Sequence, residues 1–350
     1  MTAIDEAGLD HATVVPVHDP DAPAPTPRKL EGAIGTSDKV FRGIARGSGI
    51  IVLLIMTLVG VFLTYRALQA LQTAGWSFFT TADWSPDAGA GHFGIAAVIV
   101  GTTLIALTAI VLAVPLATGT ALYISEYAPV RSKRTLISIV DLMAAVPSVV
   151  FGLWGFFLLQ GHVTGLARWI STYFGWIPFF NVEGVDPTDP LATETVYTSS
   201  TFIAGIVVGL MITPLLTSVM REVFSQAPAG EREGAYALGA TKWGMIRSVV
   251  LPFGKGGMIG GTMLGLGRAL GETIAVYMII SPIFVIQPHI LANGGSSVSS
   301  LIALRYGEAT AFGTSALMAA GLALFVMTLI VNFFASSIVS RSRSGASSDA

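Results

Sequence analysis

The chain has 350 residues, of which 53% are apolar and only 11% are charged, and its mean hydropathy is +0.71. Soluble domains carry a charge on about a quarter of their residues, so most of this chain is expected to lie away from water. A net charge of −2 does not favour nucleic acid as a partner, the absence of cysteine excludes disulfides and thiolate metal sites, and the five scattered histidines predict no metal site or cofactor.

The first 40 residues differ in composition from the rest of the chain. They are polar and rich in Pro, Asp and Ala, which is typical of a disordered tail. The N-terminus is acidic and the first apolar run begins only near Ile44, so it lacks the basic start and early apolar core of a secretory signal. We therefore predict a cytoplasmic tail at 1–40, a membrane domain at 41–340 and a short cytoplasmic tail at 341–350.

Six segments are apolar over the roughly 20 residues that a helix needs to cross a bilayer. The second contains Pro115 and the fourth contains Pro214, and a proline inside a helix removes a backbone hydrogen bond and favours a kink. The expected fold class is therefore an all-α membrane protein with six transmembrane helices. The expected spans are Ile44–Tyr65, Ile95–Ile124, Leu136–Leu159, Phe202–Met220, Met258–Ile280 and Phe312–Phe334.

The basic residues predict which side of the membrane each loop faces. Of the 19 Lys and Arg residues, all but four fall on one side when the chain crosses six times. The exceptions are Arg66, Arg168 and Arg305, on the other side, and Arg268, inside the fifth span. Because cytoplasmic loops are enriched in Lys and Arg, both termini are predicted to be cytoplasmic. The cytoplasmic set is Arg28, Lys29, Lys39, Arg42, Arg46, Arg131, Lys133, Arg134, Arg221, Arg232, Lys242, Arg247, Lys255, Arg341 and Arg343.

Two further apolar stretches are too short to cross. Leu166–Phe180 is crowded with Trp, Tyr and Phe, which favour the membrane–water interface, so it is expected to lie along the outer surface. Ser297–Tyr306 is expected to form a short external helix before the sixth span. Packing within the external loops is the alternative for both.

The loop between the fourth and fifth spans, residues 223–252, is the most informative polar stretch. Pro228 can open a helix, and Glu231 and Glu233 follow near its positive N-terminal end. Gly239 ends that helix or lets another surface approach closely. We predict two short helices joined by a Gly turn, forming a knob on the cytoplasmic face. Its apolar side chains, Ala235, Leu238 and Trp243, are expected to share one stripe.

This stretch resembles the EAA loop of ABC importer permeases. In that loop an acidic residue and Ala are followed by a Gly and, further on, by an aliphatic residue, one residue and Leu-Pro. The departure here is Gly234, where the family usually has Ala. The resemblance implies a coupling helix that sits in a groove of an ATPase subunit, and an amphipathic surface loop is the alternative. The residues that carry it are Glu233, Ala235, Gly239, Val249, Leu251 and Pro252, with Glu231 just before them.

The fifth span contains two charged residues near its middle, Arg268 and Glu272. A charge at mid-membrane costs at least about 2.5 kcal/mol, so such a pair marks function by default. Four residues apart on a helix, the two are expected to pair along one face. A guanidinium binds the oxygens of an oxyanion two at a time, so we expect Arg268 to attract an anion, while Glu272 limits that attraction, holds the Arg268 rotamer or repels the anion to hasten its release. The alternative is an ion pair that only fixes helix packing.

A stripe of glycines leads to this pair. Glycines spaced four residues apart let a neighbouring helix approach closely, and the expected neighbour is the equivalent helix of a matching subunit. The hydroxyls of Ser148 and Thr273 are expected to line the same pathway, unless they bond to their own helix backbone. The glycines are Gly257, Gly261 and Gly265, and further hydroxyls with the same two possibilities belong to Thr102, Thr103 and Thr262.

A second resemblance covers most of the chain between Phe41 and Val339. Met263–Thr273 (MLGLGRALGET) resembles the signature of the phosphate-specific transport permeases, and most of all their C subunit. Phe78–Pro86, Gly101–Pro129 and Ala144–Gly155 resemble the same subunit. The resemblance implies the type I ABC importer permease (MetI-like) fold in the cell membrane and a role as half of a phosphate pathway.

The resemblance also implies partners. These are a second permease of the A type, two copies of an ATPase subunit, an extracellular or periplasmic phosphate-binding protein, and membrane lipid. The chain has no G-x-x-x-x-G-K-[ST] motif, and GKGG at Gly254–Gly257 is not one. ATP is therefore expected to bind a partner subunit, and this chain is expected to be a transport subunit and not an enzyme.

Three other functions remain as alternatives. A permease for another oxyanion, such as sulfate or molybdate, would share the coupling loop, and only Met263–Thr273 argues against it. A carrier or channel that needs no ATPase is disfavoured by the coupling loop. A membrane-embedded enzyme needs His, Asp or Glu clustered at one depth, whereas Glu126 and Asp141 lie near span ends and are interpreted as interfacial.

Overall fold

The computed structural model describes residues 35–88, 92–186, 188–189 and 194–343, and it divides the chain into two compact units, Met1–Ile55 and Met56–Ala350. Helix α1 (Thr36–Ala74) begins in the first unit and continues into the second. The tail predicted at 1–40 lies mostly outside the described residues. Its last residues, 36–40, are already helical, so α1 begins earlier than the predicted first span.

Six helical stretches within the described residues are long and apolar enough to cross a membrane. They are Thr36–Ala74, Ala96–Tyr127, Ser148–Phe174, Thr201–Ser225, Lys242–Leu270 and Ala311–Phe334. Three of these stretches are single helices: α1, α7 (Thr201–Ser225) and α13 (Ala311–Arg343). The second consists of α3 (Ala96–Leu122) and the π-helical turn η1 (Tyr123–Tyr127). The third joins α5 (Ser148–Trp154), η2 (Gly155–Leu159) and α6 (Gln160–Phe174), and the fifth joins α9 (Lys242–Met245), η5 (Ile246–Val250) and α10 (Leu251–Leu270).

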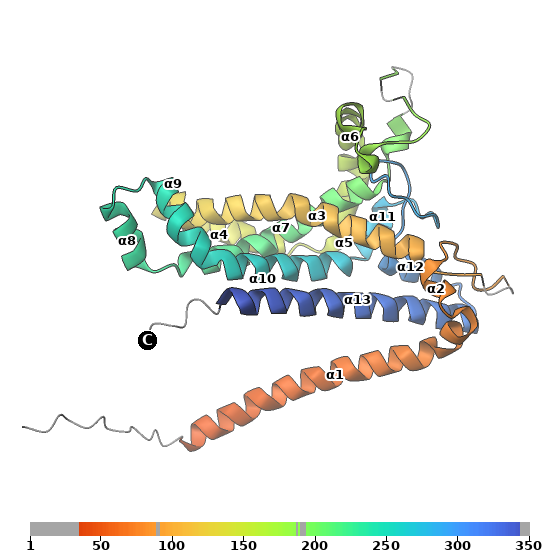
Figure 1. The fold of residues 1–350 in the computed structure, drawn as a ribbon, viewed down its shortest axis with the longest axis horizontal. Coiled ribbons are helices and arrows are strands. Elements are labelled where there is room, and N and C mark those ends of the chain that lie inside the picture. Colours follow the sequence, from red (N-terminus) through yellow and green to blue (C-terminus); the bar gives the residue numbers. More distant parts are fainter. Residues whose placement is uncertain (1–34, 89–91, 187, 190–193, 344–350) are drawn as a thin grey trace, which may run out of the picture. The chain divides into compact units, whose positions relative to one another are not determined.

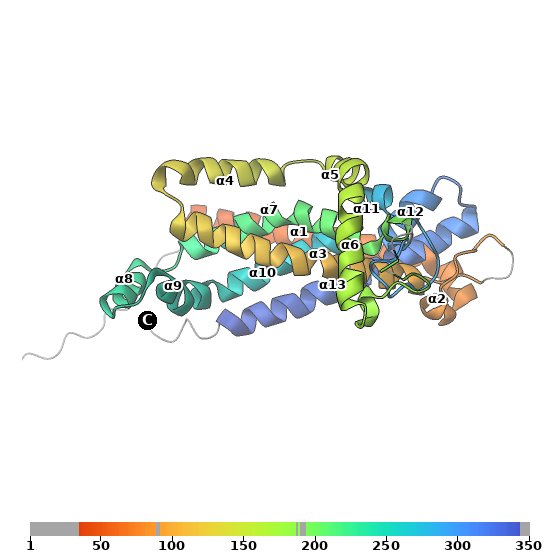
Figure 2. The same cartoon turned by 90° about the horizontal axis from the view of Figure 1, so that it is seen from above.

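The predicted third span, Leu136–Leu159, is wrong as a single helix. Helix α4 (Val130–Ala144) ends before Pro147, and a new continuous helix then runs from Ser148 to Phe174. Proline lacks a donor N–H and disfavours helical geometry in the residue before it, which explains the interruption. Figure 2 shows α4 running along the bundle beside α7, while α6 lies across it.

The aromatic stretch expected at Leu166–Phe180 is therefore not a separate element, because its first half completes α6. The 3-10 turn η3 (Pro178–Phe180) ends the stretch. Helix α6 buries Val163, Ala167 and Ser171 on one face and exposes Trp169 on another. An apolar, aromatic face on a helix that lies across the bundle is typical of a membrane interface, and that position stays a prediction.

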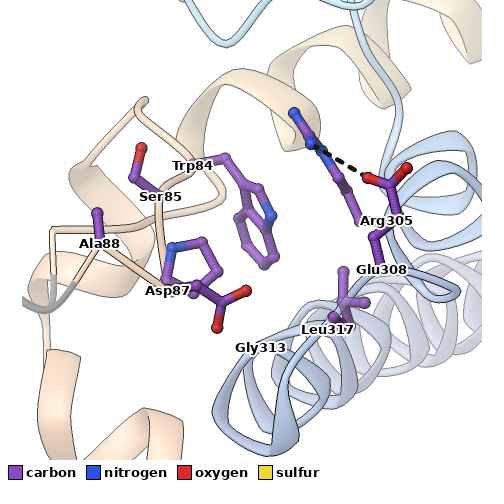
Figure 3. Close-up of a pocket in the computed structure, with 10 residues that line it drawn as sticks. Trp84, Ser85, Asp87, Ala88, Arg305, Glu308, Gly313 and Leu317 are labelled. Carbon is purple, nitrogen blue, oxygen red and sulfur yellow. Dashed lines mark ion pairs between the residues drawn. The ribbon is translucent and has the colours of Figure 1, made fainter.

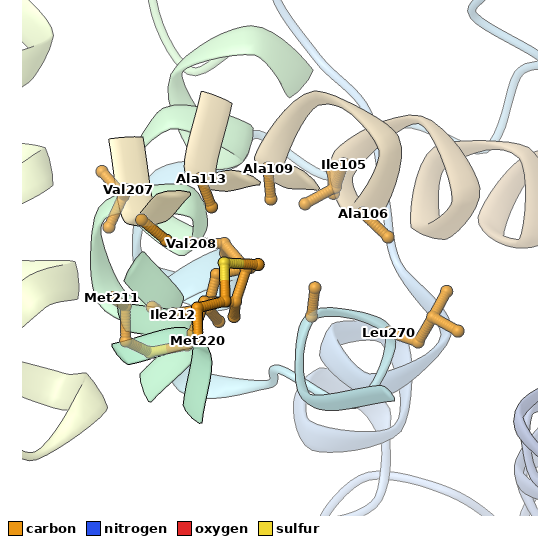
Figure 4. Close-up of a cluster of buried hydrophobic side chains, with 14 of the residues drawn as sticks. Ile105, Ala106, Ala109, Ala113, Val207, Val208, Met211, Ile212, Met220 and Leu270 are labelled. Carbon is orange, nitrogen blue, oxygen red and sulfur yellow. The ribbon is translucent and has the colours of Figure 1, made fainter. Parts of the chain in front are cut away.

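The bundle core is formed by α3, α7 and α10, which pack together (Figure 1). Small residues of α3, Ala106, Ala109 and Ala113, belong to the cluster that Figure 4 shows, and Ala109 faces α7. On α7, a Cβ added at Gly209 would lie 3.0 Å from the Ala109 carbonyl oxygen. Small residues on both sides let the two backbones approach closely, which is the usual way that helices associate in a membrane. Pro115 and Pro214 both lie inside continuous helices.

A second hydrophobic cluster lies at the end of the bundle that carries α2 (Ser77–Thr80) and α12 (Val298–Arg305). The helix predicted at Ser297–Tyr306 is present as α12, whose Ser297 and Ser300 form a reciprocal capping box. The 3-10 turn η4 (Glu194–Tyr197) belongs to a third cluster, with Ala167 of α6 and Leu291.

Four of the described basic residues, Arg232, Lys242, Arg341 and Arg343, belong to elements at one end of the bundle. Figure 1 places α8 (Ala229–Ala237), α9 and the C-terminal end of α13 at the end opposite to α2 and α12. Arg168 and Arg305 belong to α6 and α12, away from that end. This separation is what the predicted topology requires, because Lys and Arg gather on the cytoplasmic side. The sidedness itself stays a prediction.

Candidate functional site

The predicted knob is present between α7 and α10. Helix α8 (Ala229–Ala237) follows Pro228, and after Gly239 the helix α9 begins at Lys242. Gly239 has φ +83°, a left-handed conformation that glycine adopts without strain, so it makes the turn. Thr241 caps α9 by accepting a hydrogen bond from the Gly244 N–H at 3.1 Å. The loop is therefore a defined helix–turn–helix and not an irregular connection.

The surface of the knob carries both charged and large apolar side chains. Glu231 and Glu233 are exposed on α8, and Leu238 and Trp243 expose 91% and 56% of their surface. Ala235 instead packs against the bundle core, so the expected single stripe of Ala235, Leu238 and Trp243 does not form. Leu251 also packs on that core and Pro252 lies at the start of α10. An exposed leucine and tryptophan at the tip of a helical turn suit a partner's groove.

Glu126, interpreted from the sequence as interfacial, lies at the end of the second span as expected, but sequence reasoning missed its partner. Its side chain is only 5% exposed, and its Oε1 lies 3.2 Å from Arg232 Nη2 on α8. Arg232 also donates to the Phe224 carbonyl oxygen at 2.7 Å. Beside this pair, the Lys242 ammonium lies 4.6 Å from the centre of the Tyr127 ring. The signal available in the sequence was a carboxylate ending an apolar helix in a chain with an Arg-containing polar loop between the fourth and fifth spans.

The glycine stripe lies at a close helix contact, but the neighbour is α7 of the same chain. A Cβ added at Gly257 would lie 2.3 Å from Val223 Cγ2, and one at Gly265 would lie 2.3 Å from Leu216 Cδ1. At Gly261 the nearest atom, of Val219, would be 3.3 Å away. The glycine face that was expected to contact a matching subunit therefore contacts α7 of the same chain. Small residues on α10 let α7 approach closely along this face.

The predicted pairing of Arg268 with Glu272 is wrong. Helix α10 ends at Leu270, and a short break precedes α11 (Ile274–Ile279), so the two residues do not share one helix. Within the described residues no ion pair joins them. Glu272 is buried, with 8% of its surface exposed, and its Oε1 accepts the Ala275 N–H at 3.3 Å. A carboxylate that accepts a backbone N–H at a helix start stabilises that start.

Arg268 is exposed in the last turn of α10, immediately before the break. Backbone that leaves the helix within a membrane segment is tolerated where it is buried in protein or lines a water-filled path. The Thr273 hydroxyl donates to the Gly271 carbonyl oxygen at 3.2 Å within this break. Arg268 is the exposed charge beside this break.

Ser148 lies near the same break through helix packing. It begins α5, and a Cβ added at Gly152, one turn later, would lie 2.9 Å from the Ala275 Cα in α11. No hydrogen bond of its hydroxyl is among those described. The other candidate hydroxyls bond to their own helices: Thr102 to Val98, Thr103 to Ile99 and Thr262 to Met258.

Two cavities in the described part of the chain are not lined by Arg268. One of about 330 Å³ lies between the segment before α3 and the start of α13, where Trp84, Asp87, Arg305 and Glu308 line it (Figure 3). Arg305 Nη1 there lies 3.9 Å from Glu308 Oε2, and two carboxylates against one guanidinium disfavour an anion. A wider, apolar cavity of about 650 Å³ lies between α3 and Trp243 of α9. Neither has the chemistry of a phosphate site.

Comparison with known proteins places the chain in a family. Residues 113–344 match the model of the "binding-protein-dependent transport system inner membrane component" family. "Phosphate transport system permease protein PstC 2" of Mycobacterium tuberculosis is 39% identical over 303 residues, covering 86% of this chain and 91% of the relative. "Phosphate transport system permease protein PstC" of Pasteurella multocida is 37% identical over 297 residues, covering 83% and 88%.

A solved bacterial ABC transporter involved in the import of alginate has a chain that is 18% identical, with a TM-score of 0.48 and coverage of 87% of this chain and 99% of that one. The family of the chain is assigned from the family model and the two relatives, and not from this structural likeness. The chain therefore belongs to the family of binding-protein-dependent transport system inner membrane components and, within it, to the PstC phosphate transport system permease proteins.

Proposed function

We propose that this chain forms half of the translocation pathway of an ATP-driven importer of inorganic phosphate. As a PstC-type permease it is a multi-pass membrane subunit of an ABC importer and not an enzyme. The observation that carries the proposal is the α8–α9 knob, which exposes Leu238 and Trp243 at one end of a membrane bundle. A chain with no P-loop of its own and an exposed apolar knob fits a motor bound from outside the bundle.

The partners in this proposal follow from the same family. A second permease (PstA-like) completes the pathway, two copies of an ATPase subunit (PstB-like) bind ATP, and a phosphate-binding protein (PstS-like) delivers the anion outside the cell. This chain itself binds no cofactor. The knob residues Glu231, Glu233 and Gly239 then contact the groove of one ATPase subunit.

Transport proceeds by alternating access. ATP brings the two ATPase subunits together, each knob follows its groove, and the helices of the two permeases rock against each other. The cavity between them opens outward to receive phosphate, and hydrolysis returns it to the inward-open state. Close packing of α7 and α10 lets these two helices move as one body, and α3 packs against them.

Arg268 provides the attraction for the anion. It is exposed beside a helix break and, within the described residues, has no acidic partner. A planar guanidinium binds two phosphate oxygens at once. Glu272 has another role from the one expected, because its carboxylate holds the start of α11 and thereby the shape of the break.

The test is phosphate uptake by the complete importer in proteoliposomes with Arg268→Gln. Hydrogen bonds to charged groups contribute about 1.5–3 kcal/mol, so we expect uptake to fall about 10- to 100-fold. Lys255→Gln, which removes an exposed basic side chain from the start of the same helix, is the matched control. Uptake by Arg268→Gln at the rate of the unsubstituted importer sinks the assignment of Arg268.

The function as a whole has two further tests in the same vesicles. Phosphate uptake must stop when the ATPase subunit is left out, and uptake without it indicates a carrier or channel. Excess sulfate or molybdate must leave phosphate uptake unchanged, and strong competition by either indicates a permease for another oxyanion.

A further inference from the structure

Two contacts join the inner end of α3 to the coupling knob. Glu126 in η1 contacts Arg232 in α8, and Tyr127, the next residue, contacts Lys242 in α9. The knob is covalently continuous with α7 and α10, whereas α3 leads into α4. Glu126 and Arg232 are 106 residues apart in the chain. The knob is therefore joined to the end of α3 only through non-covalent contacts, and the Glu126–Arg232 pair, called the bridge below, is one of them.

Arg232 is the centre of this bridge. Its Nη1 donates to Glu126 Oε2 at 3.4 Å, its Nη2 lies 3.2 Å from Glu126 Oε1, and the same Nη2 donates to the Phe224 carbonyl oxygen at 2.7 Å. One guanidinium thus joins η1, the last turn of α7 and α8. A planar fork with several donors is suited to fixing the relative positions of three backbones.

Burial makes this bridge different from a surface ion pair. The Glu126 side chain is 5% exposed and that of Arg232 is 23% exposed. The pair Arg221–Glu222 at the same end of the bundle is longer, at 3.6 Å, and the Glu222 side chain is 60% exposed. Exposed pairs contribute little, whereas a buried charge that loses its partner is left uncompensated. The Glu126–Arg232 pair is therefore the one whose loss changes how the helices are held.

The rest of the contact between α3 and α7 restrains sliding along the helix axis less than the Glu126–Arg232 pair does. It consists of alanines on α3 against glycines and apolar residues on α7. Such surfaces pack closely, and among the described residues the side-chain hydrogen bond that restrains one helix from sliding along the other is a weak one, from the Thr118 hydroxyl to the Met220 sulfur at 3.4 Å. A directional, charge-assisted bridge at the inner end supplies that restraint.

We propose that Glu126 and Arg232 are positioning residues that transmit the motion of the coupling knob to α3. The inference rests on the proposed function, because it assumes that an ATPase moves the knob. When α8 shifts, Arg232 shifts with it and carries η1, so α3 rocks together with α7 and α10. Without the bridge, α8 still follows the ATPase, but α3 lags and the pathway opens less often in each ATP cycle.

The experiment measures phosphate uptake and ATP hydrolysis on the same proteoliposomes that contain the complete importer. The variants are Glu126→Gln, Arg232→Gln and the exchanged pair Glu126→Arg with Arg232→Glu. We expect each single variant to assemble and hydrolyse ATP, while phosphate imported per ATP falls by about tenfold, which corresponds to about 1.4 kcal/mol. We expect the exchanged pair to recover most of that ratio. Arg221→Gln with Glu222→Gln is the matched control and should leave the ratio unchanged.

Three results overturn the proposal. The first is a normal ratio of phosphate to ATP in both single variants. The second is a parallel loss of assembly, hydrolysis and uptake, because the pair is then only structural. The third is an exchanged pair that is no better coupled than the single variants. Failure of the proposed function itself is seen separately, since the unsubstituted importer then moves no phosphate on ATP addition.

Discussion

Gly257→Ala places a methyl group where α10 meets α7, and the structure predicts that it separates the two helices. The added Cβ would lie 2.3, 2.6 and 2.7 Å from Cγ2, Cγ1 and Cβ of Val223. A new rotamer can move the two Cγ atoms but not the Cβ, which is fixed to the backbone of α7. Relief therefore requires the backbones to move apart, and packed interiors resist such shifts.

The size of the effect follows from two opposing contributions. Overpacking of a well-packed contact costs about 1–3 kcal/mol, whereas exchange of Gly for Ala inside a helix favours the helix by about 1 kcal/mol. Gly260→Ala isolates the second contribution, because a Cβ there meets nothing within 4 Å. The difference in unfolding free energy between the two variants is therefore expected to be about 1–3 kcal/mol, with Gly257→Ala the less stable.

The assay is reversible unfolding of the purified chain in detergent micelles by SDS titration, followed by tryptophan fluorescence. Gly261→Ala gives an intermediate case, since its nearest neighbour, the Val219 Cγ1, would be 3.3 Å away and can give by a few tenths of an ångström. We expect Gly260→Ala to be the most stable of the three variants, Gly261→Ala to be intermediate and Gly257→Ala to be the least stable. Equal stabilities for Gly257→Ala and Gly260→Ala would show that α10 does not pack on α7 as described.

Two further predictions use other parts of the chain. Leu238→Asp should abolish co-purification of the ATPase subunit and leave the thermal stability of the permease unchanged, because Leu238 is 91% exposed; retained co-purification contradicts the knob as the coupling surface. Thr102→Val should lower the unfolding free energy by about 1–3 kcal/mol more than Thr103→Val. The buried Thr102 hydroxyl accepts the Val298 N–H at 3.0 Å, and the substitution leaves that N–H unpaired; equal losses contradict this contact.

Apolar periodicity and charge bias predict the parts of this fold that follow from composition. The first, second, fourth and sixth spans are set by long apolar runs, and each appears as a helix near its expected place. The third span failed because apolarity continues across Pro147, although the backbone cannot continue there as a helix. Hydropathy measures the tendency to leave water and does not detect where one helix ends and the next begins.

The knob was predictable because its signals are local. Pro228, Gly239 and the acidic first turn each have a direct effect on the backbone at their own position. Its attachment was not predictable, since the partner of Arg232 is 106 residues away and several carboxylates were available to it. Long-range pairing depends on how helices pack, and the neighbour of the glycine stripe was misjudged for the same reason.

The charged pair of the fifth span shows how a wrong geometry changes the functional argument. A spacing of four residues predicts pairing only if the helix continues, but the Glu272 side chain bonds to the backbone at Ala275, and such local bonds compete with helix. Arg268 is then left exposed without an intrachain acid among the described residues. An unpaired guanidinium in a span is costlier than a paired one, and the described residues supply no carboxylate to compensate it. Under the proposed function, a phosphate that passes the break would supply the compensating charge only transiently, which is what a transport pathway needs.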